Sequence, residues 1–221
     1  THCRSYISAE AGFYLKQHYK VPFLFDMRGF WPDERVDNKQ WPQHNILFRY
    51  LYQSYKRKEI IFLKEAAAVV ALTQAAKTEM QSWPAFGKLN VDIIPCCADL
   101  QHFDFHNVTS TQTNELKQTL NISPSSRVIT YLGSFGGPYM TAEMLAFFKQ
   151  LLASDPNYIM VFYSKDDPDM LVTEVEQHGI PADKIRVQYV KRNELPVYLS
   201  ISDFSLFFIR NTYSKIASSP T

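Results

Sequence analysis

A run of charged and aromatic side chains follows an apolar segment early in the chain. The run is Asp26-Met27-Arg28-Gly29-Phe30-Trp31-Pro32-Asp33-Glu34-Arg35, and it comes directly after residues 21–25. Carboxylates and guanidinium groups orient hydroxyls or bind phosphate, and an indole ring stacks on a sugar face. The candidates for catalysis are therefore Asp26, Arg28, Asp33 and Glu34. Trp31 is a candidate contact for the acceptor. The structural alternative is an Asp26–Arg28 pair that fixes a loop, with Trp31 filling the core.

A second candidate is the glycine-rich stretch Tyr131-Leu132-Gly133-Ser134-Phe135-Gly136-Gly137, which holds three of the seven glycines. It joins a predicted strand to a predicted helix, where glycines let the backbone approach a ligand and the helix N-terminus favours phosphate. The spacing departs from the dinucleotide pattern G-x-G-x-x-G. A phosphate-binding loop and a plain tight turn are both compatible with it.

In the first half, three apolar runs predict buried strands, and these would position the charged run. The runs are residues 21–25, 67–72 and 91–95. Helical patterns cover 5–19 and 46–65, and Thr73 is a candidate N-cap for a further helix. The stretch between the first strand and the helix at 46 contains Pro32 and Pro42, which predicts a loop.

The second half repeats this alternation from residue 127. Strands are predicted at 128–132, 158–163, 185–190 and 204–209, and helices at 142–152, 168–178 and 194–200. Such alternation indicates parallel sheets of βαβ units. The polar stretch before it has one short helical pattern, at 114–120. We therefore predict an α/β protein of two Rossmann-like domains, 1–100 and 127–221, joined by a linker at 101–126, with ligands beyond the carboxyl ends of the strands.

Composition narrows the class of protein. The chain has 23 Lys and Arg against 22 Asp and Glu, so no single-sign field favours nucleic acid. Its cysteines, Cys3, Cys96 and Cys97, suggest no disulfide framework, and its histidines have no metal-ligand spacing. The longest apolar stretch, 66–72, falls far short of the roughly 20 residues of a membrane span. These features predict a cytoplasmic protein without a metal site.

Both ends suggest that the sequence is a piece of a longer protein. It begins Thr1-His2-Cys3-Arg4, without methionine, and stops at Ser218-Ser219-Pro220-Thr221 just after a predicted strand.

Six segments, taken in order, resemble the family 4 (group 1) glycosyltransferases, especially bacterial members that build surface polysaccharides. They are HCRSY, FDMRGFWPDE, VVALTQAAKTEM, IIPCCADLQHF, ITYLGSFGG and IASSPT. The resemblance covers nearly the whole chain. It implies the GT-B architecture, with the acceptor mainly on the first Rossmann-like domain and a nucleotide-sugar donor mainly on the second. It also implies transfer with retention at the anomeric carbon and no metal or other cofactor.

The resemblance also assigns residues. The glycine loop would approach the donor diphosphate through its backbone N–H groups, the stretch 187–192 would cradle the nucleotide base, and the final loop would lie beside the diphosphate. The donor-binding candidates are Gly133, Ser134, Gly136, Gly137, Val190, Lys191, Arg192, Ser218, Ser219 and Thr221. An exposed basic turn is the alternative for 190–192.

The sequence departs from the family pattern at three places. Many relatives follow the glycine loop with an Arg and a Lys, but this chain has Pro138-Tyr139-Met140-Thr141. Many relatives have a His near the position of Arg28. The helix after IASSPT, whose glutamate usually holds the donor ribose, is absent, so the fragment is predicted to be inactive. His2 and Arg4, at the end of a predicted strand, are further acceptor-side candidates.

The function predicted is transfer of a sugar to a glycan or lipid-linked acceptor in cell-surface polysaccharide biosynthesis. A nucleotide-sugar epimerase of the same fold and a non-catalytic binding module are the alternatives. The helix at 46–65 carries four cations that would contact an anionic membrane surface or simply face solvent: Arg49, Lys56, Arg57 and Lys58.

Overall fold

The computed structural model describes residues 1–83 and 90–219 and divides them into two compact units. The first unit comprises residues 1–97 with the described residues 211–219, and the second comprises 98–210. Each unit contains one parallel sheet with helices packed against it, so the predicted α/β class with two Rossmann-like domains is confirmed.

The first unit is built on four parallel strands in the order β1-β2-β3-β4. They are β1 (His2–Arg4), β2 (Leu24–Asp26), β3 (Ala68–Ala71) and β4 (Val91–Ile93). Helices α1 (Ser5–Tyr19) and α3 (Ile46–Glu65) have the bounds that their sequence patterns predict. Helix α4 (Gln74–Ser82) begins after Thr73, whose hydroxyl accepts from the Ala76 N–H at 3.0 Å, as expected of an N-cap.

The stretch after β2 contains a helix that the sequence analysis missed. Helix α2 (Trp31–Asp37) occupies part of the predicted loop. Pro32 lies in its first turn, where a missing N–H costs nothing, and Asp33 and Glu34 favour the same end of the helix dipole. Proline therefore starts a helix here, and the prediction of a loop was wrong.

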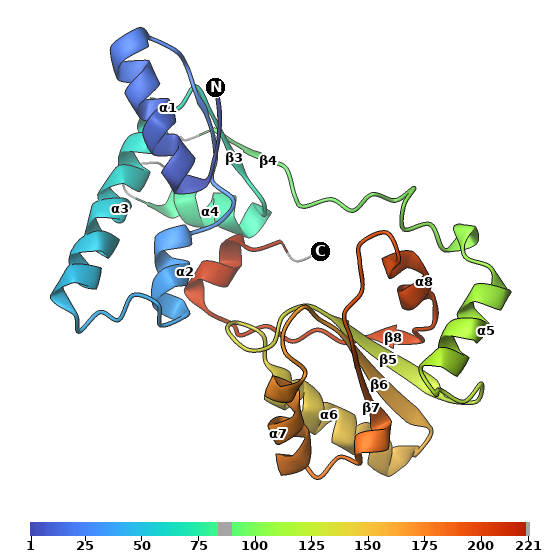
Figure 1. Ribbon diagram of the computed structural model, residues 1–221. Coiled ribbons are helices and arrows are strands. Elements are labelled where there is room, and N and C mark those ends of the chain that lie inside the picture. Colours follow the sequence, from blue (N-terminus) through green and yellow to red (C-terminus); the bar gives the residue numbers. More distant parts are fainter. Residues whose placement is uncertain (84–89, 220–221) are drawn as a thin grey trace. The chain divides into compact units, whose positions relative to one another are not determined.

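The second unit has a parallel sheet in the order β7-β6-β5-β8. Its strands are β5 (Arg127–Leu132), β6 (Tyr158–Tyr163), β7 (Ile185–Gln188) and β8 (Phe204–Ser205). Alternate residues along β5 and β6 enter two different cores. One core includes α6 (Thr141–Ser154) and α7 (Asp169–Gln177), the other α5 (Ser110–Thr119) and α8 (Leu195–Ser200), so each face of the sheet has its own pair of helices (Figure 1). The 3-10 turn η2 (Ala182–Lys184) leads into β7.

The predicted linker at 101–126 is instead part of the second unit. It contains the 3-10 turn η1 (Phe105–Asn107) and α5, which starts with a capping box of Thr109 and Gln112. Leu116, Leu120 and Ile122 pack into the core beside α8. These few apolar side chains anchor a segment whose overall composition is polar. The prediction of a linker was wrong because it rested on that overall composition.

The predicted boundary of the second domain at 221 also needs correction, because residues 211–219 return to the first unit. There the 3-10 turn η3 (Tyr213–Ala217) buries Ala217 in the core. The Tyr213 ring stacks on Phe30 with 5.4 Å between centroids, and Lys215 pairs with Glu34 at 2.7 Å. These contacts join residues far apart in sequence, which no local pattern predicts.

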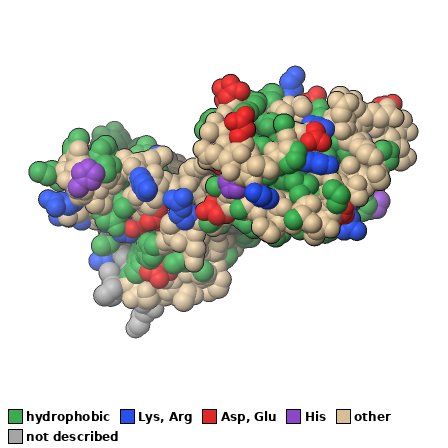
Figure 2. Space-filling view, turned by 90° about the horizontal axis from the view of Figure 1, so that it is seen from below, with side chains coloured by type: hydrophobic (Ala, Val, Ile, Leu, Met, Phe, Trp, Pro, Cys, Tyr) green, Lys and Arg blue, Asp and Glu red, His purple; other side chains and the backbone are tan. Residues whose placement is uncertain are grey.

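On the face shown in Figure 2, Lys and Arg side chains are interspersed with Asp and Glu side chains. Among the described helices, none is long and apolar enough to cross a membrane.

Candidate functional site

A pocket of about 500 Å³ lies at the carboxyl ends of β5, β6 and β7 in the second unit. This is the edge where parallel sheets of this kind bind ligands. Five of the predicted donor-binding residues line the pocket together, and they are Gly133, Ser134, Val190, Lys191 and Arg192.

The glycine loop is held in place by its neighbours. The Gly133 N–H donates to the Tyr163 carbonyl at 3.1 Å, and the Tyr131 hydroxyl donates to the Ser134 carbonyl at 2.6 Å. Burial raises the pKa of Tyr131, so its hydroxyl keeps its proton and remains a donor. Gly136 and Gly137 have φ of 71° and 62°, the left-handed conformation that glycine adopts without a steric penalty.

Hydrogen bonding within the unit limits which loop N–H groups face a ligand. The N–H groups of Gly133 and Gly136 already donate to the Tyr163 carbonyl and the Thr141 hydroxyl. Among the described residues, none accepts a hydrogen bond from Ser134 or Gly137 N–H. Helix α6 begins just beyond the loop, and no side chain of the described residues caps it, so its first N–H groups have no partner among those residues. Ser134 lines the pocket, whereas Gly136, Gly137 and the first residues of α6 are not among its lining residues. The Gly137 N–H and this helix end are therefore donors next to the pocket, beside the Ser134 N–H within it.

The stretch 190–192 is held against the rest of the second unit. Val190 is buried, and the Lys191 N–H donates to the Glu194 carboxylate at 3.2 Å. The His102 ring donates to the Arg192 carbonyl at 2.9 Å, and the Arg192 guanidinium lies 5.8 Å from the Phe103 ring centre. The segment is therefore a positioned wall of the pocket, with Lys191 and Arg192 themselves exposed.

Sequence reasoning missed several lining residues. Three tyrosines and the turn after β6 complete the wall: Tyr139, Tyr163, Tyr189, Ser164 and Lys165. The turn after β6 follows a predicted parallel strand, as the glycine loop follows β5. This position after a parallel strand could have identified the turn as a candidate. The turn was overlooked because it contains no glycine.

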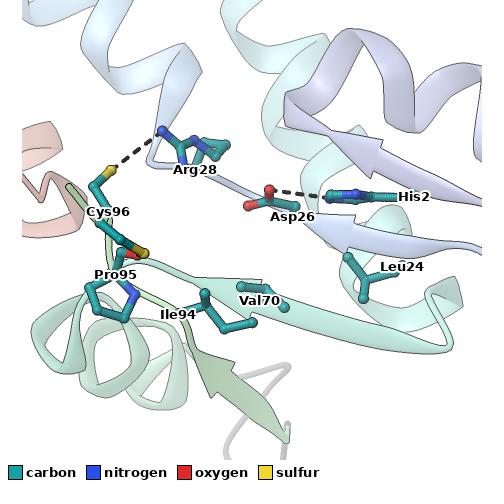
Figure 3. Close-up of a pocket in the computed structure, with 9 residues that line it drawn as sticks. His2, Leu24, Asp26, Arg28, Val70, Ile94, Pro95 and Cys96 are labelled. Atoms are coloured by element: carbon teal, nitrogen blue, oxygen red, sulfur yellow. Dashed lines mark hydrogen bonds and ion pairs between the residues drawn. The ribbon is translucent and has the colours of Figure 1, made fainter. Parts of the chain in front are cut away.

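A second, smaller pocket of about 310 Å³ lies in the first unit, lined from the first residues of β1 and β2, His2 and Leu24, to Asp26 at the end of β2 and Ile94 just after β4. Its polar lining comes from His2, Asp26 and Arg28, and Leu24, Val70, Ile94 and Pro95 are apolar. The His2 Nε2 lies 3.3 Å from Asp26 Oδ2. A dashed line marks this contact in Figure 3. The other oxygen, Asp26 Oδ1, is buried and accepts no hydrogen bond from the described residues. This oxygen is enclosed by the protein and is not exposed to the pocket.

Arg28 reaches the same pocket from a strained backbone. Its φ is 62°, unusual for a residue with a side chain, and its guanidinium donates to Cys96 Sγ at 3.4 Å (Figure 3). Asp26 pairs with His2 and Arg28 with Cys96, so the Asp26–Arg28 pair considered as a structural alternative does not form within the described chain. Sequence reasoning had no signal for Cys96 as a partner of Arg28.

The other first-unit candidates do not line this pocket. Asp33 is buried and accepts from Tyr52 and Lys56, and Glu34 pairs with Lys215. Trp31 packs against the aromatic rings of Tyr6, Trp41 and Tyr55, which matches its structural alternative. Arg4 is exposed at the end of β1.

The serines predicted at the donor site follow η3 and belong to the first unit. Ser218 N–H donates to the Lys215 carbonyl, which continues the turn, and Ser219 comes next. The structure therefore groups Ser218 and Ser219 with α2 and α4, whereas the glycine loop lies in the other unit. Thr221 lies outside the described residues.

Comparison with solved structures gives the fold. A glycosyltransferase from Rickettsia africae ESF-5 matches with a TM-score of 0.67 and 14% identity over 92% of this chain and 49% of that one. WaaG, a glycosyltransferase involved in lipopolysaccharide biosynthesis, matches with a TM-score of 0.64 and 13% identity over 93% and 58%. The chain has the GT-B fold of glycosyltransferases.

A further GT-B match is a UDP-forming alpha,alpha-trehalose-phosphate synthase from Burkholderia vietnamiensis. Its TM-score is 0.64, with 13% identity over 94% of this chain and 50% of that one. The chain thus spans about half the length of these GT-B structures. No family model and no curated protein sequence matches it.

A buried ionic cluster lies between α1, α2 and α3 of the first GT-B unit. Lys56 Nζ lies 2.6 Å from Glu59 Oε1 and 3.0 Å from Asp33 Oδ2, and the Tyr6 hydroxyl donates to Glu59. Burial raises the pKa of Glu59, and the nearby Lys56 ammonium partly offsets this rise. For Lys56, burial alone would lower the pKa, but the carboxylates of Glu59 and Asp33 have the larger effect, so the pKa of Lys56 is raised. In this cluster, the Asp33 carboxylate joins α2 to α3 and does not face a pocket lined by the other candidates.

This cluster also bears on the four cations of α3 that the sequence analysis considered for membrane contact. Lys56 is engaged inside the unit, and Lys58 pairs with Glu10 at 2.6 Å. Arg49 and Arg57 are the exposed members. In residues 1–83 and 90–219, no group of three His, Cys, Asp or Glu side chains is placed to hold a metal ion.

Proposed function

We propose that this chain is part of a glycosyltransferase that takes a sugar from a nucleotide-sugar donor. The observation that carries the proposal is the second-unit pocket, which brings the glycine loop and the stretch 190–192 together at the carboxyl edge of a parallel sheet. One end offers backbone donors suited to a diphosphate, and the other offers Val190 and Tyr189 as apolar surface for a base. The GT-B fold supports the same reading.

In this proposal, catalysis consists mainly of stabilising the departing diphosphate. The N–H groups of Ser134 and Gly137 and the uncapped first turn of α6 are fixed before the ligand arrives, so they need little reorganisation as charge develops. We propose that this charge stabilisation does not depend on a metal ion or another cofactor, and that transfer proceeds with retention.

The first-unit pocket is proposed to bind the acceptor, a glycan or a lipid-linked sugar. His2, Asp26 and Arg28 supply the polar groups that contact the acceptor's hydroxyls, and the His2 ring holds Asp26 Oδ2. The apolar lining residues suit the carbon face of a sugar ring. The role we propose is cell-surface polysaccharide biosynthesis on the cytoplasmic side.

Peripheral membrane contact is proposed for the start of α3. Ile46, Leu47 and Tyr50 are 75%, 62% and 63% exposed there, beside the exposed Arg49. Apolar and cationic side chains together bind an anionic bilayer. We expect the chain to sediment with phosphatidylglycerol vesicles and not with phosphatidylcholine vesicles, and the double variant Leu47→Gln, Arg49→Gln to lose most of this binding. Equal sedimentation of both proteins would contradict this contact.

The nucleotide proposal predicts a melting-temperature shift. A ligand that binds only the folded state adds about 2.7 kcal/mol of stability at a hundredfold excess over Kd. We therefore expect UDP, GDP or ADP, or one of their sugars, to raise the melting temperature of the chain. The nucleotide that does so identifies the base. A folded chain whose melting temperature none of them changes would contradict the proposal.

A further inference from the structure

The second-unit pocket has no cation directly after its glycine loop, where many of the glycosyltransferases that the sequence resembles have an Arg and a Lys. No Lys or Arg occurs in 133–141, although a diphosphate needs positive charge nearby when water is displaced. Three cations from other segments line the pocket instead, and they are Lys165, Lys191 and Arg192.

Strand order distinguishes these cations. β6 is the direct neighbour of β5, with Tyr163 opposite Leu132, whereas β7 lies beyond β6. Adjacent strands are about 4.8 Å apart. Lys165 follows β6 by two residues and is therefore one strand from the glycine loop, and Lys191 and Arg192 follow β7, two strands from it.

Hydrogen bonds tie the turn of Lys165 to the glycine loop. The Gly133 N–H donates to the Tyr163 carbonyl at 3.1 Å, and the Phe135 N–H donates to the Asp166 carboxylate at 2.5 Å. The Asp166 N–H donates to the Ser164 hydroxyl at 3.1 Å, which fixes the turn itself. Lys165 is therefore attached to a segment that is bonded on both sides to the loop.

The ammonium group of Lys165 is available for a ligand. It makes no ion pair within 4.0 Å among the described residues. The neighbouring carboxylates accept backbone N–H groups, Asp166 from Phe135 and Asp167 from Asp169. The Arg192 guanidinium is directed to the Phe103 ring. The side chain of Lys165 is exposed, so a phosphate group does not have to displace a protein partner.

We propose that Lys165 is the cation that binds the phosphate groups of the donor, in place of the cations absent after the glycine loop. This rests on the proposed function, because it takes the pocket to be the nucleotide-sugar site. Lys191 and Arg192 then face the nucleoside end of the same ligand.

The test compares ligands with and without phosphate. Calorimetric titration of the full chain would use UDP, GDP and ADP against uridine, guanosine and adenosine. For the diphosphate that binds, we expect Lys165→Gln to weaken binding by roughly tenfold or more, because a charged hydrogen bond is lost. The affinity of the Lys165→Gln variant for the matching nucleoside should equal that of the parent chain. Lys165→Arg should retain most of the diphosphate affinity.

The matched control is Lys149→Gln, an exposed lysine of α6 outside the pocket, which should bind like the parent chain. Diphosphate binding by Lys165→Gln at the parent's affinity, or an equal loss for diphosphate and nucleoside, would overturn the assignment of Lys165. A folded parent chain that binds no nucleotide would overturn the proposed function itself. Circular dichroism of each variant separates these outcomes from unfolding.

Discussion

Replacing Lys56 by methionine is expected to destabilise the first unit by about 3–5 kcal/mol. The side chains of Asp33 and Glu59 are only 9% and 1% exposed, and Lys56 is the cation that both contact. Its removal leaves two buried carboxylates with hydroxyl donors alone, Tyr52 for Asp33 and Tyr6 for Glu59. Urea unfolding followed by circular dichroism measures the loss.

The pH dependence of this loss has a definite sign. Without Lys56, the folded-state pKa of Glu59 should rise further above its unfolded value. Such a group contributes stability while it is protonated, and loses it as pH rises through the folded pKa. We therefore expect Lys56→Met to cost more at pH 8 than at pH 5. Lys58→Met, which breaks the half-exposed pair with Glu10 and the contact of the ammonium with the Tyr55 ring, should cost no more than about 1 kcal/mol. Equal costs for the two variants would show that the cluster is not a buried ionic one.

Adding one methyl group at Gly133 is expected to disrupt the proposed donor site. A Cβ there would lie 2.5 Å from the Tyr131 hydroxyl and 2.8 Å from Cζ of the same ring. Tyr131 cannot yield easily, because it is 1% exposed, packs on Phe162 and donates to the Ser134 carbonyl. We expect Gly133→Ala to destabilise the second unit by about 1–3 kcal/mol. It should also weaken binding of the nucleotide that stabilises the parent chain.

Gly179 supplies the control for this variant. It has a positive φ of 62°, and a Cβ there would meet only Lys149 Nζ, at 3.8 Å. Gly179→Ala should cost about 1 kcal/mol of stability through backbone strain without changing nucleotide affinity. Unchanged nucleotide affinity in folded Gly133→Ala would contradict the role of the glycine loop.

Local patterns in the sequence predict the elements of this fold well, and long-range packing poorly. The bounds of α1, α3 and β6 agree with the sequence patterns, because each is a continuous run with a clear period or apolar content. The return of η3 to the first unit depends on single contacts such as Lys215 with Glu34 and Tyr213 with Phe30. Nothing in the local sequence around either residue of such a pair predicts which residue it contacts.

The candidate site shows the same division. Gly133 was a candidate because a glycine loop follows a predicted strand, and the stretch 190–192 because of the family resemblance; the structure brings them to one pocket. Asp33 and Glu34 could not be distinguished from Asp26 by sequence, since a short helix turns them away toward Lys56 and Lys215. Charge density in a loop does not reveal whether the partner is a ligand or another helix.

Hydrogen–deuterium exchange with a saturating nucleoside diphosphate would test the nucleotide pocket most directly. Backbone N–H groups that donate to a bound ligand exchange more slowly. We predict slower exchange at 133–137, 164–165 and 189–192, with β1 and α1 of the first unit unchanged. Protection confined to the first unit, or none at saturation, would contradict the assignment of the second-unit pocket to the nucleotide-sugar donor.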